Sequence, residues 1–508
     1  MTTRAAKRPR CHGSGPAVCA HPKRTRRSLQ TAEETSRQTR PYLQESVPTE
    51  VLVHIFSFLR ERELARVARV CRRFREIGEL QSLWRNLFHR VFELEAAYVR
   101  PSSSDQKTPP TSELNWKEQF ALMHGCLHVY PKMASLPLSH PLRSEAPYSQ
   151  YFSTISEAVQ SSSEGDRIVV HPGVYNETVA LDKPVQLIGA GPEKVLLVNS
   201  SLTVVDVKPS AGDATIANME IKFDAPEDNP SLRQYCIQVP GGASPNVHNC
   251  HFTNTSFCGA CVYIHGSGAR PRVTHCTIAN ANNVGVFVDD HAHGYFEHNN
   301  IHGNKLAGVW IKNYASPVFR ENEVHHGKDV GFFVFQDGQG VLESNDIHSN
   351  RIAGIEIKND ANPIIYRCSI HHGSTGGVYV HDRGRGQFIE NKIFANTYAG
   401  VWITSESNPT LRDNEIFGGL QGGVYFFGGG RGVLENNNIH SNTLAGVQIR
   451  TGSDPIIRNN EIHHGLHGGI YVHDSGRGLV EVTRFIRMRW LEFGSLLESA
   501  CSEAEQDS

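Results

Sequence analysis

The chain has 508 residues, of which 39% are hydrophobic and 20% charged, as is ordinary for a soluble protein of two or three domains. Its formal net charge of −2 excludes a protein that binds polyanions over its whole surface, and no apolar run is long enough for a membrane-spanning helix. The N-terminus lacks the apolar core of a secretory signal, so the eleven cysteines are expected to stay reduced, in the cytosol or nucleus.

Residues 1–44 are polar, and their composition predicts a disordered tail. Residues 1–40 contain ten Lys/Arg side chains and only two acidic ones, Glu33 and Glu34, which gives this segment a net charge of +8. The basic side chains include two short clusters, Lys7, Arg8 and Arg10, then Lys23, Arg24, Arg26 and Arg27. This spacing predicts a bipartite nuclear-import signal, and hence a nuclear protein with some cytoplasmic fraction. The alternative is a solubilising tail that binds polyanions weakly.

Residues 45–90 have the periodicity of three short helices, and Pro48 suits the first turn of the first one. Their apolar positions are Val51, Leu52, Ile55, Phe56 and Leu59, then Leu64, Val67, Cys71 and Phe74, then Leu83, Trp84, Leu87 and Phe88. So small a unit is not expected to bury all of this surface by itself. Periodicity leaves two interpretations open: a self-contained helical subdomain, or an apolar face that a partner completes.

The order of residues in this stretch resembles an F-box, with Ile55–Phe56–Ser57–Phe58–Leu59 and Val70–Cys71–Arg72–Arg73–Phe74 as its most specific runs. The resemblance implies docking to a Skp adaptor, and through it to a cullin and a RING protein. It assigns adaptor contacts to Pro48, Val51, Leu52, Ile55, Phe56, Leu59, Leu64, Val70, Cys71, Phe74 and Trp84.

Residues 91–147 are predicted to form a helical linker, and residues 148–484 form an array that repeats every 23 residues. One column is glycine: Gly285, Gly308, Gly331, Gly354, Gly377, Gly400, Gly423, Gly446 and Gly469. A second alternates Pro and Gly, as in Pro317, Gly340, Pro363 and Gly386. A third is Asn299, Asn322, Asn345, Cys368, Asn391, Asn414, Asn437 and Asn460. A fourth, two residues further on, is Ile301, Val324, Ile347, Ile370, Ile393, Ile416, Ile439 and Ile462.

Each repeat holds two or three short β-branched runs and nothing that resembles a helix, which predicts a mainly β fold, a right-handed parallel β-helix of 23-residue coils. The aliphatic column should fill the core, the Asn column should form a ladder between coils, and the glycine columns suit turns with positive φ. A short helix at Thr154–Gln160 is expected to cover the open end of the core.

The array resembles carbohydrate-binding and sugar-hydrolase repeats, and an F-box followed by such an array is similar to a family of F-box-only proteins. The resemblance implies a non-catalytic substrate receptor of an SCF-type (Skp–cullin–F-box) ubiquitin ligase, with a protein substrate and no cofactor. Members of that family are longer, with more coils and a zinc finger. This chain is therefore expected to be a C-terminally shortened form whose repeat fails between Gly478 and Phe485. Residues 485–508 form either a non-repeat tail or a replacement helical cap.

Three candidate sites within the array receive a structural interpretation. Cys250, Cys258, Cys261, His265 and Cys276 contain one C-x₂-C pair, but Cys276 falls in the Asn column, so buried coil cysteines are favoured over zinc. The pairs His325–His326, His371–His372 and His463–His464 recur with the repeat and are read as architectural, so no metal is assigned. Asp289–Asp290–His291 is the nearest approach to a catalytic carboxylate cluster, yet it belongs to a turn column.

Substrate is expected on a lateral face of the solenoid. The out-of-register aromatic residues Phe332, Phe335 and Phe426 are assigned to that face, and the in-register column Phe333, Tyr379, Tyr425 and Tyr471 is assigned to the core. No nucleic acid or membrane partner is expected. The alternative function is a carbohydrate-binding or polysaccharide-cleaving β-helix protein.

Overall fold

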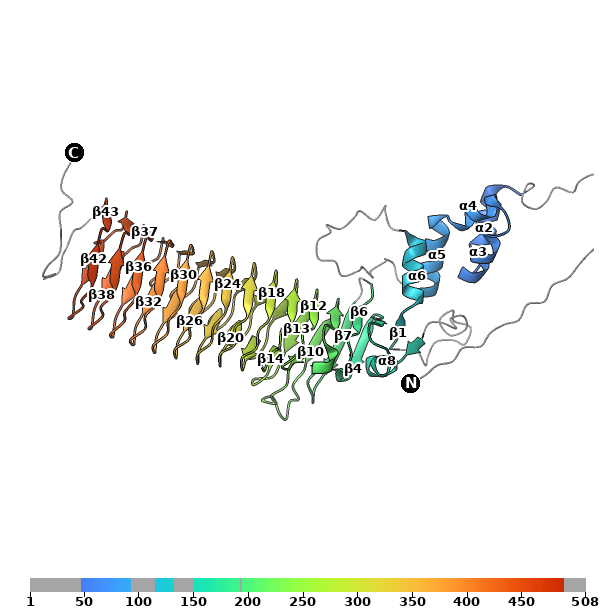
Figure 1. Ribbon diagram of the computed structural model, residues 1–508, viewed down its shortest axis with the longest axis horizontal. Helices are drawn as coiled ribbons and strands as arrows, with labels where there is room; N and C mark the ends of the chain where they lie inside the picture. The colour runs from blue at the N-terminus through green and yellow to red at the C-terminus, as the bar shows by residue number, and fades with distance from the viewer. Residues whose placement is uncertain (1–46, 93–114, 132–149, 192–193, 488–508) are drawn as a thin grey trace, which may run out of the picture.

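The structure, a computed structural model, describes residues 47–92, 115–131, 150–191 and 194–487. A small helical unit lies at one end of a long solenoid (Figure 1). The helices are α2 (Thr49–Phe56), α3 (Glu61–Val67), α4 (Arg72–Gly78), α5 (Gln81–Phe92), α6 (Trp116–His124) and α8 (Ile155–Ser161). Among these helices none is long and apolar enough to cross a membrane.

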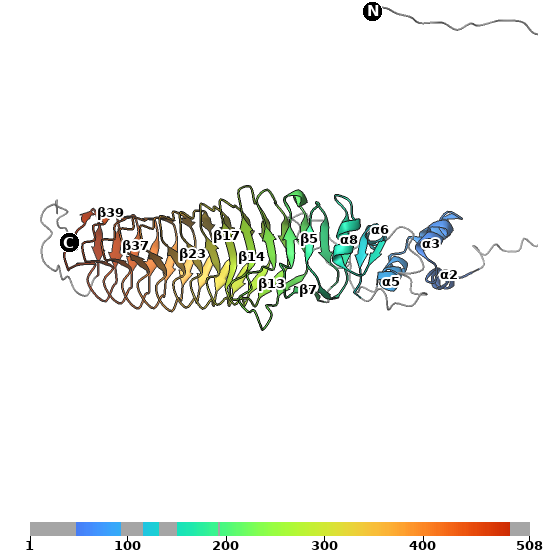
Figure 2. The ribbon, with the colours of Figure 1, turned by 90° about the horizontal axis from the view of Figure 1, so that it is seen from below.

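The solenoid is a right-handed parallel β-helix of about 15 turns, as the 23-residue period predicts. Its strands form three parallel sheets of 16, 14 and 13 strands, here called sheets A, B and C. Sheet A runs from β2 (Gln150–Phe152) to β42 (Leu479–Glu481), sheet B from β4 (Gly173–Asn176) to β43 (Arg484–Ile486), and sheet C from β5 (Val179–Leu181) to β41 (Ile470–Val472). Seen from below, the coils stack into a rod (Figure 2).

A regular coil contributes one three-residue strand to each sheet. In one such coil, β23 (Phe332–Val334) belongs to sheet C, β24 (Val341–Glu343) to sheet A and β25 (Asp346–His348) to sheet B. In sheets A and B the middle residue points inward, whereas in sheet C the two outer residues point inward and the middle one outward. The fully buried aliphatic column from Ile301 to Ile462 confirms its predicted place in the core.

The Asn column forms the predicted ladder. Asn299, Asn322, Asn391, Asn414 and Asn437 each donate from Nδ2 to Oδ1 of the next Asn, at 2.9–3.0 Å. Each Asn also donates to a carbonyl 26 residues earlier, which satisfies buried polar groups in every turn. Cys276 and Cys368 occupy the same column, and the backbone N–H of each donates to Oδ1 of the Asn in the next coil.

The first glycine column is required by close approach between coils, and not by positive φ as the sequence analysis expected. A Cβ added to Gly354 would lie 2.6 Å from Cγ2 of Ile370 and 2.9 Å from the carbonyl oxygen of Gly377. Positive φ is found instead in the alternating column, 118° at Gly340 and 131° at Gly386.

The N-terminal end of the solenoid is closed as predicted by a short helix, α8, which buries Ile155, Ala158 and Val159. Thr154 is its N-cap and accepts a hydrogen bond from the backbone N–H of Glu157. The predicted helical linker holds α6, but it also supplies a strand that the sequence analysis did not expect. This strand, β1 (Leu127–Val129), lies between β2 and β3 (Arg167–Val170) in sheet A.

The C-terminal coil keeps its strand pairing further than the sequence analysis expected. Strand β42 pairs with β39 (Ile456–Arg458), and β43 pairs with β40 (Glu461–His463), so Phe485 takes the next position in the aliphatic column. Val482 is 85% exposed and Phe485 37% exposed. The predicted helical cap and tail beyond residue 487 lie outside the described residues, as does the basic tail of residues 1–44.

Candidate functional site

The helical unit has a small core that contains four of the residues that the sequence analysis assigned to the adaptor. Leu52, Phe56, Leu64 and Trp84 are buried, and Phe56 packs edge-on against Phe74 with ring centroids 5.3 Å apart. The Trp84 indole N–H donates to the carbonyl of Gly78. These four side chains therefore hold the helices together and cannot themselves form a contact surface.

A stripe of exposed apolar side chains remains on the first helix and the turn that follows it. Val51 is 46% exposed, Ile55 45% and Phe58 68%, and they recur at the helical spacing of four and three residues. Pro48 lies exposed at the start of the stripe, and Val70 (65% exposed) lies after α3. Leu59, Cys71 and Phe74 are half-buried. We call Pro48, Val51, Ile55 and Phe58 the apolar stripe.

The sequence analysis assigned Pro48, Val51 and Ile55 of this stripe but did not assign Phe58, its most exposed member. The helical spacing could have identified it, because Phe58 follows Ile55 by three residues. In the structure the N–H of Phe58 donates to the carbonyl of Ile55, so the helical turn continues to this residue. Exposed phenylalanine in a unit this small favours a surface that a partner covers.

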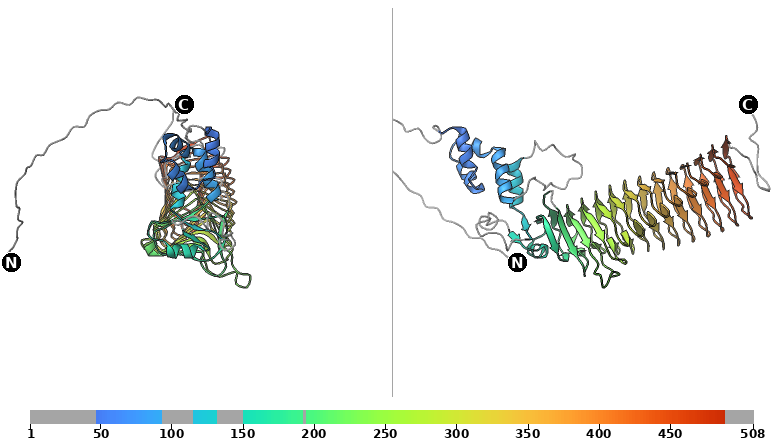
Figure 3. Two further views of the ribbon diagram at one scale, coloured as in Figure 1. Left: turned by 90° about the vertical axis from the view of Figure 1, so that its right-hand side faces the viewer. Right: turned by 180° about the vertical axis from the view of Figure 1, so that it is seen from behind.

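The helical unit is packed directly on the first coils of the solenoid. Phe92 of α5 packs against Phe120 of α6, with ring centroids 5.3 Å apart, and stacks on His128 of β1 at 5.5 Å. Val169 of β3 and Ala190 belong to the same core cluster. The core of the helical unit thus extends onto the outer side of the first coils, and we call this region the joint. Viewed along the axis of the rod, the first helices lie in front of its upper part (Figure 3, left).

Two buried histidines complete the joint. Nε2 of His128 donates to the carbonyl of Met123 at 2.9 Å, so its Nδ1 must accept from Nε2 of His171, at 3.0 Å. Burial lowers the pKa of His128 to about 4 and the pKa of His171 to about 3, so both rings are neutral at neutral pH.

The outer face of sheet C carries a column of aromatic rings from adjacent coils. Tyr263, Phe287, Trp310 and Phe333 follow one another, with neighbouring ring centroids 5.1–6.4 Å apart. After Glu356, which takes the next position, the column continues with Tyr379, Trp402 and Tyr425, at 5.7–6.1 Å. We call this column the aromatic face. Its rings are half-buried by their neighbours.

This arrangement overturns the sequence assignment of the aromatic residues. Phe332 and Phe426, which were assigned to the substrate face, are fully buried in the core. Phe333, Tyr379, Tyr425 and Tyr471, which were assigned to the core, point outward. Phe335 does lie on the outer face, where it stacks on Phe333 with ring centroids 4.4 Å apart.

The cysteines and acids of the other candidate sites serve the coil architecture. Cys250, Cys261 and Cys276 are buried as predicted, whereas Cys258 is exposed. Burial raises the pKa of the Cys261 and Cys276 thiols, which disfavours the thiolate form that metals bind. Asp290 and His291 take positive φ values of 49° and 59°, as residues of a tight turn do. One other group, Glu323, His325 and His348, brings three metal-ligand atoms within 4.8 Å of one another.

Comparison with known proteins supports both parts of this description. Residues 44–90 match the F-box-like family model, and residues 260–397 and 353–485 match the model described as right-handed beta helix region. The F-box protein dre-1 of Caenorhabditis elegans is 41% identical over 293 residues, which are 52% of this chain and 30% of that protein. The chain thus spans less than a third of the length of that relative.

Solved structures with similar coils share the fold alone. The A-module of the Azotobacter vinelandii mannuronan C-5 epimerase AlgE4 is 13% identical with a TM-score of 0.42, over 68% of this chain and 94% of that one. The catalytic domain of a GH87 alpha-1,3-glucanase is also 13% identical with a TM-score of 0.39, over 67% of this chain and 66% of that one. The helical unit thus matches the F-box-like model and the solenoid matches the right-handed beta helix model, each over part of the chain.

Proposed function

We propose that this chain is the substrate-recognition subunit of an SCF-type E3 ubiquitin ligase. In this role the apolar stripe docks a Skp adaptor, which links the chain to a cullin and a RING subunit, and the solenoid binds the protein to be ubiquitinated. The observation that carries the proposal is the exposure of Val51, Ile55 and Phe58 on a unit that matches the F-box-like family. The domain combination also resembles F-box only protein 11.

The joint supports a receptor role on mechanical grounds. A ligase must hold its substrate at a fixed place relative to the RING subunit, because a lysine can react only where it reaches the activated ubiquitin. Here Phe92, Phe120 and His128 pack the helical unit onto sheet A, and this packing fixes the adaptor end relative to the solenoid surface.

We further propose that the aromatic face is the surface that binds the substrate protein. Large rings supply much contact area at a small cost in side-chain entropy, and protein interfaces are enriched in Tyr, Trp and Phe. Lys312 and Lys358 lie over the rings of Phe287 and Phe333, at 5.2 and 4.9 Å, and add positive charge beside the apolar surface. A folded protein or an extended segment that presents apolar and acidic side chains would fit such a face.

We propose that the chain itself is not catalytic. The Asp289 carboxylate accepts a hydrogen bond from Asn313 and lies 3.8 Å from Nζ of Lys312, so it is already engaged by side chains of the next coil. Asp290 stands at a turn position that Gln336, Asp382, Gly428 and Asp474 occupy on alternate coils. An acid repeated along a rod supports architecture better than a unique reaction centre.

Binding of a purified Skp adaptor tests the proposal. Ile55→Asp with Phe58→Asp places two charges on exposed positions and should weaken adaptor binding by about a hundredfold or more, as loss of interface anchors does. Leu202→Asp with Val482→Asp, two exposed apolar residues of the solenoid, is the matched control and should bind like the wild type. Unchanged affinity of the stripe variant, measured by calorimetry on folded protein, would refute the docking surface.

A further inference from the structure

The outer face of sheet B carries a column of stacked rings that the proposed function does not use. The column consists of His302, His325, His348, His371, Phe394, Phe417, His440 and His463, with neighbouring centroids 4.6–5.1 Å apart. Beside it, two residues earlier on each strand, runs a polar column, which includes Asn300, Glu323, Asp346, Glu415 and Asn438. Each histidine can therefore meet a polar group of its own coil and of the coil before.

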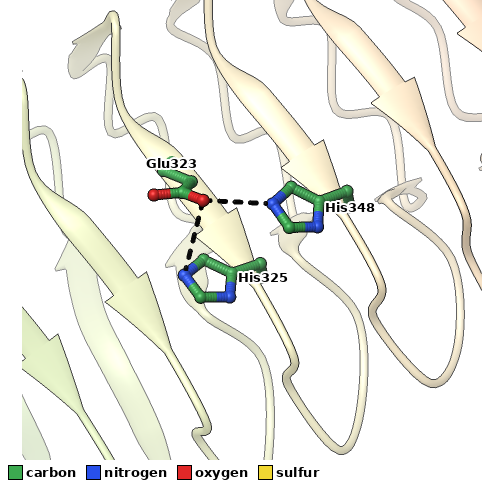
Figure 4. A group of neighbouring side chains, drawn as sticks. All are labelled: Glu323, His325 and His348. Carbon is green, nitrogen blue, oxygen red and sulfur yellow. Dashed lines mark hydrogen bonds and ion pairs between the residues drawn. The ribbon is translucent and has the colours of Figure 1, made fainter.

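At one coil a carboxylate lies beside two stacked rings and contacts one nitrogen of each (Figure 4). Oε1 of Glu323 is 3.2 Å from Nε2 of His348 and 3.8 Å from Nε2 of His325. The two rings are stacked almost in parallel, with an angle of 6° and centroids 5.0 Å apart. Their side chains are 15% and 17% exposed, and that of Glu323 is 46% exposed. The group is open to solvent on one side and walled by the sheet on the other.

These distances are close to what a tetrahedral metal site needs. Zn²⁺ bonds imidazole nitrogen and carboxylate oxygen at about 2.0–2.1 Å, which places ligand atoms about 3.3 Å apart. The two carboxylate–imidazole distances bracket that value. The imidazole nitrogens of His325 and His348 lie within 4.8 Å of each other, so they need to approach by at most about 1.5 Å. Small rotations about χ1 and χ2 of the two side chains provide this movement.

Neighbouring groups hold two of the three ligands from outside the metal position. Nδ2 of Asn300 donates to Oε2 of Glu323 at 3.3 Å, and Nδ1 of His348 lies 3.1 Å from Oγ of Ser349. Metal-binding histidines are typically held through their other nitrogen, and ligating carboxylates through their second oxygen. Nε2 of His325 lies 3.0 Å from Oδ1 of Asn300, and a bound metal would take the place of this contact.

The same column offers a natural comparison. Four coils further on, Glu415 and His440 repeat the acid–imidazole pair at 3.3 Å, but the ring on the strand of the acid is Phe417. In the described part of the chain, the pair thus has a second imidazole on the strand of the acid at Glu323 and a phenylalanine there at Glu415. The shorter Asp346, one coil after Glu323, lies 2.8 Å from Nε2 of His371 but does not form a three-ligand group. The adjacent pairs such as His325–His326, which the sequence analysis weighed as metal ligands, also converge, Nδ1 to Nδ1 at 2.5 Å. Among the described residues, however, the histidines that meet with a carboxylate in a three-ligand group are 23 residues apart.

We propose that Glu323, His325 and His348 form a binding site for Zn²⁺, with the fourth position open to water or to a donor atom of a bound protein. The donor set is the two-imidazole, one-carboxylate combination that zinc accepts in proteins. The open side faces solvent, so an ion can enter without unfolding of a coil. The site does not depend on adaptor binding and stands or falls separately from it.

Titration of the metal-free chain with Co²⁺, a spectroscopic substitute for Zn²⁺, tests the proposal. His325→Phe recreates at this coil the arrangement that the chain already has at Phe417, so it should fold, and it should lose one bound ion. His440→Phe keeps the ring column and serves as the matched control, which should bind like the wild type.

The visible spectrum and competition with Zn²⁺ distinguish this ion from any Co²⁺ bound by cysteine thiolates. The difference between the wild-type and His325→Phe spectra should be that of one ion bound by nitrogen and oxygen. An equal number of ions with equal affinity in wild type and His325→Phe would overturn the site. Loss of the ion in His440→Phe as well would also overturn it, because it would mean that the ring column as a whole, and not this group, collects the metal.

Discussion

Replacement of one ladder residue, Asn414, should loosen the solenoid locally by a predictable amount. The Asn414 side chain makes four hydrogen bonds of 2.9 Å: it donates to Phe388 and Asn437, and it accepts from the backbone and the side chain of Asn391. It is 1% exposed, so water cannot replace these partners. At a net value of about 1 kcal/mol for each bond, Asn414→Ala should cost about 4 kcal/mol.

Asn414→Cys is the matched variant, because the chain already places cysteine in this column at Cys368. There the thiol donates to the carbonyl of Leu342, at 3.3 Å, which is the counterpart of the Phe388 carbonyl, and accepts from Nδ2 of Asn345 at 3.7 Å. Asn414→Cys should therefore keep two of the four bonds and cost less than Asn414→Ala, roughly 2 kcal/mol.

Hydrogen exchange followed coil by coil measures this effect, because local opening free energies are read from protection factors. Protection should fall most in the coils of residues 388–437, in the order wild type, Cys variant, Ala variant. Equal protection in all three proteins, or a loss confined to the ends of the rod, would refute the view that the Asn column couples successive coils.

Three further predictions address the joint, the aromatic face and the tail. The pKa of His128 and the pKa of His171 are both lower in the folded chain than the unfolded value of 6.5, so the unfolded chain binds protons first on acidification. Between pH 6.5 and 4 the joint should therefore lose up to about 1.4 kcal/mol of stability per pH unit for each ring. Urea midpoints that do not move over this window would contradict this prediction. Trp402→Ala with Tyr425→Ala should abolish substrate capture, whereas Tyr295→Ala with Tyr366→Ala on sheet A should not, in pull-downs from cells. Deletion of residues 1–30 should shift the protein from nucleus to cytoplasm on imaging, without effect on adaptor binding.

The architecture of the solenoid is readable from the sequence because it depends on local repetition. The 23-residue step, the Asn column and the buried Ile/Val column each follow from residues that recur in every coil, and the structure places them as expected. The joint could not be read in this way. Strand β1 and the packing of Phe92 on His128 occur once and join segments that are far apart in the sequence. They are therefore not part of the repeat, and its period cannot predict them.

The aromatic face was misassigned for a reason that the sequence could have corrected. Strands of sheet C have aliphatic residues on both flanks in coil after coil, as in Val378–Tyr379–Val380, whereas the central position varies. That position holds Glu356 and Gln448 in two coils, and a charged side chain in the column marks the outward direction. For the direction of a side chain in this column, the polar residues that replace the aromatic rings in some coils were a better guide than the number of rings in register.

The same distinction applies to the helical unit. Helical periodicity identifies its apolar positions, but it does not divide them between the core and a partner surface. That division depends on how α2, α4 and α5 pack, which buries Phe56 and Trp84 and leaves Ile55 and Phe58 outside. A charge at Phe56 would therefore unfold the unit, and only the exposed residues can test partner binding.

Affinity purification of the chain from cells, with the proteasome and cullin activation each inhibited, tests the central claim most directly. Wild-type protein should bring down a Skp adaptor, a cullin and a RING subunit, together with proteins that accumulate only when degradation is blocked. The Ile55→Asp, Phe58→Asp variant should lose the three ligase subunits and keep the accumulating proteins, because the solenoid is unchanged. A wild-type chain that recovers no adaptor, or a stripe variant that recovers as much adaptor as the wild type, would contradict the account.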